Sequence, residues 1–281
     1  MAKVSVAALN ITMSPHPPGG YAKLLNRAKL RRAEGIFRGH RRGRIVQLAN
    51  REDEDGLVRG RVATWVDIDT KKAWLNEESS LAATPEEVAK ISMPPHMKPE
   101  YLPIDFFADF AHHKVFVELP VGASTVARAF REMLNTPLVN ESEGKVNVTL
   151  VQDRDSLLRI LAMKEIRRLK IVLTRPNPDN WDTIEHAVHE QMKRQGLDEI
   201  DVIYVGNTEG VKVDAGMTAL ANAALIDGSV SATGLNETGA RQAESTADHP
   251  LIQSVTKNDN ETADSALKRA VKKIRDTVLR R

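Results

Sequence analysis

The sequence predicts an α+β protein, and three observations support this prediction. Strand-like and helix-like segments alternate between residues 146 and 234, which is typical of a sheet with helices packed against it. Two hairpin patterns earlier in the chain indicate antiparallel strands as well, so we expect a mixed sheet. Near the C-terminus, a helix pattern has an apolar stripe on one side and basic residues on the other.

The N-terminal half contains a short helix, two hairpins and two further helix patterns. Residues 21–35 form the first helix pattern, which Gly35 is expected to end. The acidic segment 51–56 ends with a glycine and predicts the turn of the first hairpin. Thr84 followed by Pro85 predicts the start of the second helix, because both residue types favour helix N-termini. The remaining patterns are strands at 44–50, 58–66, 104–110 and 114–119 and a helix at 121–134.

The C-terminal half contains the most regular alternation of strands and helices. Strands are predicted at 146–151, 169–173, 201–205, 229–234 and 241–246. Helices are predicted at 156–163, 182–194, 217–226 and 261–281. The polar, turn-rich segment 136–145 indicates a domain boundary. We therefore expect an N-terminal hairpin and helix domain with a basic cluster over residues 1–140, and a β-α-β domain with the C-terminal helix over residues 141–281.

The composition excludes several classes of site. The chain has no cysteine, which excludes disulfides, thiolate-bound zinc, iron–sulfur clusters and a cysteine nucleophile, and which fits a reducing compartment. No apolar run reaches the ~18–20 residues that a membrane-spanning helix needs. The N-terminal segment lacks the apolar core and cleavage site of a secretory signal. We expect a cytoplasmic protein that does not bind membranes.

Charge is distributed unevenly along the chain. Residues 1–51 contain 11 lysines and arginines against one acidic residue, Glu34, and residues 267–281 contain seven against Asp276. These segments carry net charges of +10 and +6, so the overall charge of +2 leaves −14 for residues 52–266. Either the basic termini fold onto the acidic middle of the chain, or they bind an external polyanion.

We expect the basic segments to bind nucleic acid, and DNA in particular, because arginine and lysine neutralise phosphates without reading the base sequence. Lys23, Arg27 and Arg31 share one helix face at four-residue spacing. The candidate nucleic-acid-binding residues are Arg31, Arg32, Arg38, Arg41, Arg42 and Arg44, with Lys272, Lys273 and Arg275 as a second patch. Two alternatives remain open: a solvated basic surface that balances the acidic middle, and a protein-interaction surface that binds an acidic partner or a second copy of the chain.

The sequence contains no complete catalytic motif. It lacks phosphate-binding glycine loops, a serine nucleophile elbow and the His-Glu-x-x-His zinc motif. Asp153, Asp155, His186 and His189 would serve a metal-dependent nuclease, which is the alternative function, although the aspartates are better explained as helix caps. We therefore predict no cofactor, no metal and no hydrolytic activity. Arg175 lies in a proline-stiffened segment after a strand, which serves either as a rigid connection or as a binding loop.

Several segments resemble an uncharacterised bacterial family, a domain of unknown function of about this length. VTLVQDRDSL and TRPNPDN carry most of the resemblance, which extends over nearly the whole chain from about residue 44. No activity and no catalytic residue come with it. The order of hairpins, helix, β-α-β region and C-terminal helix is also similar to that of the phage-exclusion protein RexA and the Kiwa defence subunit KwaB. This likeness implies a DNA-associated role in phage defence or a prophage, together with a partner protein of that defence.

Overall fold

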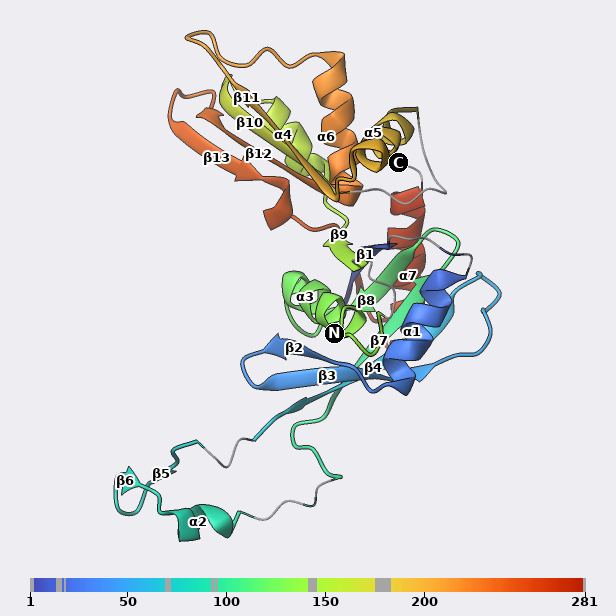
Figure 1. Cartoon of the computed structure of the whole chain (residues 1–281), viewed down its shortest axis with the longest axis vertical. Helices are drawn as coiled ribbons and strands as arrows, with labels where there is room; N and C mark the ends of the chain where they lie inside the picture. Colours follow the sequence, from blue (N-terminus) through green and yellow to red (C-terminus); the bar gives the residue numbers. More distant parts are fainter. Residues whose placement is uncertain are drawn as a thin grey trace.

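The computed structural model describes residues 3–13, 17, 19–68, 72–91, 94, 96–140, 146–174 and 183–279, without the side chains of 183–186 and 189. The chain forms two antiparallel sheets, one of eight strands and one of four, and a short two-stranded ribbon. Helices pack on both larger sheets, and Figure 1 shows the four-stranded sheet above the eight-stranded one. The α+β class predicted from the sequence is therefore confirmed.

The eight-stranded sheet is built mostly from the N-terminal half of the chain. Its main path follows the order β14-β1-β8-β7-β4-β3-β2, and β9 also pairs with β1. The bounds of these strands are β1 (Lys3–Met13), β2 (Glu34–Arg38), β3 (Arg41–Leu48), β4 (Val58–Val66), β7 (Leu102–Asp109), β8 (Lys114–Glu118), β9 (Val146–Leu150) and β14 (Ile252–Thr256). The two predicted hairpins, β3 with β4 and β7 with β8, are confirmed.

Strand β1 is a central strand that the sequence did not predict. It pairs with β8 along one side, while β14 and β9 share its other side. Its residues from Val6 to Thr12 are all buried, so both faces of the strand carry small or apolar side chains. Such a continuous apolar run has no period-two alternation, and it cannot be recognised as a strand by periodicity.

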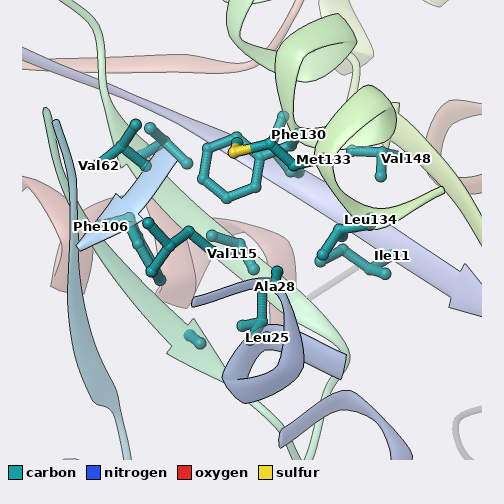
Figure 2. Close-up of a cluster of buried hydrophobic side chains, with 14 of the residues drawn as sticks. Ile11, Leu25, Ala28, Val62, Phe106, Val115, Phe130, Met133, Leu134 and Val148 are labelled. Atoms are coloured by element: carbon teal, nitrogen blue, oxygen red, sulfur yellow. The ribbon is translucent and has the colours of Figure 1, made fainter. Parts of the chain in front are cut away.

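Helices cover the eight-stranded sheet on both faces. Successive residues of a strand point to opposite faces, and on β1 Leu9 and Ile11 belong to one core whereas Val6 and Ala8 belong to another. The first core lies under α1 (Gly20–Leu30) and α3 (Ala123–Leu134), and the second lies under α7 (Ala263–Leu279). Figure 2 shows the first core, where side chains of α1, α3 and the strands converge.

Gly35 lies within β2 and does not end the first helix, which stops at Leu30. A Cβ atom on Gly35 would lie 2.2 Å from the carbonyl oxygen of Ala129 in α3. The glycine is therefore explained by the close approach of β2 to α3 rather than by a helix terminus. The arginine-rich run after it forms the β2–β3 hairpin, whose turn includes Gly39.

The four-stranded sheet follows the order β11-β10-β12-β13. Its strands are β10 (Glu165–Thr174), β11 (Glu199–Val205), β12 (Gly228–Leu235) and β13 (Arg241–Ser245). The helices packed with it are α4 (Arg154–Leu161), α5 (Thr183–Gln195) and α6 (Ala215–Asp227). Leu169, Ile171 and Val230 are buried with the helices in a third core. Arg168 and Thr233 point to the opposite face, where they are exposed to solvent.

All pairings between the described strands are antiparallel, whereas a mixed sheet was expected. The reason is that α5 returns the chain to the end of the sheet it left, because Thr174 and Glu199 are register partners. The β-α-β unit does exist as β11, α6 and β12. Those two strands both run antiparallel to β10, which lies between them.

The elements after residue 141 contribute to both sheets. β9, β14 and α7 pack on the eight-stranded sheet, whereas β10 to β13 form the four-stranded one. The division into 1–140 and 141–281 remains a prediction. A short excursion between β4 and β7 contains β5 (Leu75–Asn76), β6 (Leu81–Ala82) and α2 (Pro85–Ala89), and Figure 1 shows it extending away from the sheets. Thr84 caps α2 as predicted, in a capping box with Glu87.

No helix within the described residues is both long enough and apolar enough to cross a membrane.

Candidate functional site

Helix α1 carries the first group of candidate residues. Tyr21, Leu24, Leu25 and Ala28 are buried on its inner side, and Tyr21 stacks on His113 with 4.3 Å between the ring centroids. This burial turns the basic side chains of the helix away from the core. We define the basic α1 surface as Lys23, Arg27, Lys29, Arg31 and Arg32. The helix itself contains no acidic residue.

The basic α1 surface is accessible and partly hollowed. Lys23, Arg27 and Arg31 line a shallow open depression together with Asn26 and the exposed Leu30. Arg27 Nη1 also donates to the Val139 carbonyl oxygen at 2.8 Å, which ties the helix to the segment after α3. In the described part of the chain, Lys23, Lys29 and Arg32 form no ion pair with an acidic side chain. Their charge is therefore available to an outside anion.

The arginines of the β2–β3 hairpin are mostly engaged within the fold. Arg41 Nη2 lies 2.8 Å from Glu100 Oε2, and Arg41 Nη1 donates to the Glu100 carbonyl oxygen at 2.9 Å. Arg42 Nε lies 3.2 Å from Asp67 Oδ2. The Arg44 guanidinium lies 5.6 Å from the centre of the Trp65 ring, in a cation–π contact. Arg38 is exposed at the far end of β2.

The predicted N-terminal residues do not form one continuous patch. Arg32 precedes β2 and Arg38 ends it, and a six-residue step along a strand spans roughly 20 Å. Arg31 and Arg32 therefore belong to the basic α1 surface, whereas Arg38, Arg41, Arg42 and Arg44 belong to the hairpin. The acidic residues that pair with the hairpin, at positions 67 and 100, come from the acidic middle of the chain.

The second predicted patch divides in the same way. Lys272 and Lys273 are exposed on α7. Arg275 instead has its Nε 2.9 Å from Asp109 Oδ2, and the Asp109 side chain is only 1% exposed. Arg275 Nη1 also donates to the Asp55 carbonyl oxygen at 2.8 Å. This guanidinium neutralises a buried carboxylate, which is a structural role.

The two predicted patches lie on opposite faces of the eight-stranded sheet. α1 packs on the core that contains Leu9 and Phe106, and α7 packs on the core that contains Ala8 and Phe107. Neighbouring residues of one strand point in opposite directions. The lysines of α7 therefore cannot extend the basic α1 surface into a single contact area.

A buried polar cluster that the sequence did not predict lies between the two sheets. Asn10 of β1 donates from Nδ2 to Asp227 Oδ1 at the end of α6, and Lys114 Nζ of β8 donates to Asn10 Oδ1. Thr174 Oγ1 donates to the Asp227 carbonyl oxygen at 2.6 Å. Thr149 Oγ1 donates to the carbonyl oxygen of Ile226 at 3.3 Å. The two threonine bonds satisfy carbonyls at the end of α6, and the Asn10 and Thr149 bonds join this helix to the eight-stranded sheet.

The electrostatics of this cluster are set by burial. Removal from water raises the pKa of Asp227 to about 6, and the nearby Lys114 and the Asn10 hydrogen bond only partly offset that effect. Carboxylates with a raised pKa occur in functional sites and also in structural hydrogen-bond networks. The only sequence signal was Asn10, a polar residue within the apolar run of β1.

The alternative nuclease residues do not come together as a metal site. Asp153 is the N-cap of α4 and accepts a hydrogen bond from the Asp155 backbone N–H at 3.3 Å, so its predicted capping role is confirmed. The side chains of His186 and His189, and the whole of Arg175, lie outside the described residues. Within the described part of the chain, no group of three or more histidine, aspartate or glutamate side chains has the arrangement of a metal site.

These features define a two-sheet α+β protein with a surface helix that carries basic residues and no acidic one, and with a buried polar cluster between its sheets. A family model covers almost all of this architecture, from residue 2 to residue 273. The chain belongs to that family, which is described as a domain of unknown function (DUF4747). The resemblance to an uncharacterised family is thereby confirmed. A comparison with curated proteins finds no match.

Proposed function

We propose that this protein binds nucleic acid through the basic α1 surface. One observation carries the proposal: α1 presents cations without any acidic residue of its own, and Lys23, Lys29 and Arg32 have no acidic partner within the described structure. Surface cations in a folded protein are usually interspersed with acidic residues. An uncompensated basic helix is the electrostatic footprint of a polyanion partner.

The spacing of the cations supports a phosphate backbone as that partner. Lys23 and Arg31 are separated by eight residues, which is about 12 Å along a helix. One strand of DNA carries a charge about every 3.4 Å of helix axis, so this distance corresponds to three or four phosphates. Neutralising phosphates supplies affinity without base specificity, and the binding is expected to tolerate any sequence.

We further propose that this binding takes place in phage defence or phage exclusion. A role in phage defence or phage exclusion, in the cytoplasm, is supported by the similar order of elements in RexA and KwaB and by the absence of cysteine. Genomic neighbours from defence systems or prophages, found beside many members of the family, would support this setting. Neighbours that are consistently unrelated would remove it.

Salt-dependent binding to a random DNA duplex tests the proposal directly. If about four phosphates are neutralised, the slope of log K against log salt is expected near −3.6, from about 0.9 per phosphate. Fluorescence anisotropy with a labelled duplex measures this slope, and a single-stranded RNA of equal length tests the preference for DNA. Undetectable binding at low salt, or a slope near zero, would overturn the proposal.

A pair of charge-matched variants localises the binding. The first carries Lys23→Ala, Lys29→Ala and Arg32→Gly, where glycine is chosen because Arg32 has a left-handed φ of 52°. The second carries Lys268→Ala, Lys272→Ala and Lys273→Ala on the opposite face of the sheet. Each loses three charges, but only the first is expected to flatten the slope, by about 2–3. Equal effects of both would show that the net charge, and not the basic α1 surface, drives binding.

A further inference from the structure

Strand β11 leaves one backbone edge of the four-stranded sheet open. Among the described strands it pairs only with β10, through an unbroken register from Arg168–Val205 to Thr174–Glu199. The opposite side of β11 therefore presents unpaired backbone N–H and C=O groups over a strand of seven residues. Such an edge is a template for another strand.

β11 is less protected than β2 and β13, because its charged residues, Glu199 and Asp201, are confined to one half of the strand. β2 has five residues, contains Glu34 and Arg38, and shifts register near its end. β13 has five residues and contains Arg241 and Glu244. β11 has no proline, no basic residue and no bulge, and its Ile203 and Val205 side chains are 44% and 73% exposed. Natural edges with these properties are usually covered by a partner.

The charges around β11 are complementary to a second copy in antiparallel orientation. Glu199 and Asp201 lie on the open face at one end of β11, and Asp201 Oδ2 is 2.7 Å from Lys170 Nζ. At the other end, exposed Arg168 of β10 lies directly opposite Val205 on the same face. Antiparallel pairing of two β11 strands places Glu199 of one copy opposite Val205 of the other. Arg168 then lies one strand beyond Val205, on the same face as Glu199 of the other copy and about 10 Å from it, so the two long side chains can meet over Val205 at both ends of the pair.

A parallel arrangement is disfavoured by the same charges. In parallel register, each acidic residue of β11 lies beside its own equivalent, and like charges on neighbouring strands are destabilising. In the antiparallel register Val202 lies opposite its own equivalent at the centre of the contact, and Ile203 lies opposite Asp201 of the other copy. The edge is thus self-complementary, as a two-fold interface requires.

We propose that two copies of this protein associate through antiparallel pairing of β11, which joins their four-stranded sheets into one continuous sheet. The pairing supplies backbone hydrogen bonds along both strands and covers the exposed Ile203 and Val205 side chains. The basic α1 surface belongs to the other sheet of each copy, so association through β11 leaves it accessible.

Molar mass in solution tests the association without any ligand. Light scattering coupled to gel filtration is expected to report twice 31.1 kDa for the full chain at micromolar concentrations. Ile203→Glu combined with Val205→Glu changes only exposed side chains, places like charges opposite Asp201 and Glu199 of the other copy, and is expected to give the monomer mass. The matched control, Val46→Glu with Ile252→Glu, changes exposed residues of the eight-stranded sheet and is expected to remain a dimer. A wild-type monomer at all concentrations, or a glutamate variant of β11 that remains a dimer, would overturn the proposal.

A charge exchange then tests the orientation. Arg168→Glu puts a like charge two strands away from Glu199 of the partner copy, at both ends of the pair, and is expected to weaken the dimer about tenfold. Adding Glu199→Arg restores opposite charges only if the strands are antiparallel, so the double variant is expected to recover the wild-type dissociation constant within about threefold. Sedimentation equilibrium measures both values. A double variant as weak as the single one would contradict the antiparallel pairing.

Discussion

The two sheets of this protein differ in how their faces are covered. Helices pack on both faces of the eight-stranded sheet, and β1, β7 and β8 bury apolar side chains in both directions. The four-stranded sheet packs its helices on one face, while its other face exposes Arg168 and Thr233. Apolar burial is the main stabilising contribution to folding. We therefore expect the eight-stranded sheet to contribute most of the stability. The four-stranded sheet has an exposed face and an open edge that are available for other contacts.

The largest expected effect comes from weakening the packing of α7 on the eight-stranded sheet. Leu267 is 3% exposed and packs in the core between α7 and the strands. We expect Leu267→Ala to lower the free energy of unfolding by about 2–5 kcal/mol, because a buried leucine leaves a cavity when it is truncated. Urea denaturation followed by circular dichroism measures this loss. A change below about 1 kcal/mol would mean that α7 is not an essential cover.

The boundary between the sheets is expected to give a pH-dependent effect. Burial raises the folded-state pKa of Asp227 from 3.8 to about 6. Below about pH 4 the carboxyl is protonated in both the folded and unfolded states, whereas above about pH 6 the folded state carries the full cost of a buried charge. We expect Asp227→Asn to exceed the wild type in stability by up to about 3 kcal/mol near pH 7.5, from about two pKa units at ~1.4 kcal/mol each.

The same comparison at lower pH provides the control for Asp227. As the pH falls from about 6 to about 4, the wild type gains the stability that the charge had cost, and the two proteins should converge. Urea denaturation of both proteins at several pH values measures the convergence. A stability difference that stays constant between about pH 4 and 8 would show that Asp227 does not titrate in this range.

A smaller effect is expected where α7 meets the β7–β8 turn. Arg275→Ala leaves the buried Asp109 carboxylate with His112 as its remaining side-chain partner. We expect a loss of about 1.5–3 kcal/mol, the contribution of hydrogen bonds to a charged group. Removal of the exposed Lys272 and Lys273 together should change the free energy of unfolding by less than about 0.5 kcal/mol. Thermal unfolding of both variants distinguishes the structural cation from the solvated ones.

The smallest effect is expected on the open face of the four-stranded sheet. Thr233 is exposed on β12, opposite Arg168 and on the face away from the third core. Thr233→Ala should therefore change the free energy of unfolding by no more than about 0.5 kcal/mol. Chemical denaturation measures this change. A loss of several kcal/mol would show that this face is covered in solution, and the contrast between the two sheets would disappear.

The sequence predicted most helices and hairpins because their patterns are local. Asp153 capped α4, Thr84 capped α2, and the alternation at 58–66 marked a half-covered strand. β1 was missed because a strand buried on both faces has no alternation to detect. Its identity depends on partners far away in the chain, and those partners are set by the tertiary fold.

The candidate site was predictable only in part. Composition located the basic segments, but ion pairing depends on which acidic residues the fold brings near. Arg41 forms an ion pair with Glu100 and Arg275 with Asp109, whereas Lys23 pairs with no acidic residue in the described structure. The Asp227 cluster was not predicted because its members come from distant parts of the chain: Asn10 lies 104 positions before Lys114 and 217 before Asp227.

The placement of β1 has a consequence for the order of synthesis. Ser5 and Ser254 are in contact across the β1–β14 pair although 249 positions separate them. Ribosomes add about 5–20 residues per second, so the first strand waits roughly 12–50 s for its last neighbour. During that interval the apolar run of β1 has neither its β14 ladder nor the cover of α7. Completion of the larger sheet therefore waits for the synthesis of residues 252–279, and until then β1 is open to pairing with another chain.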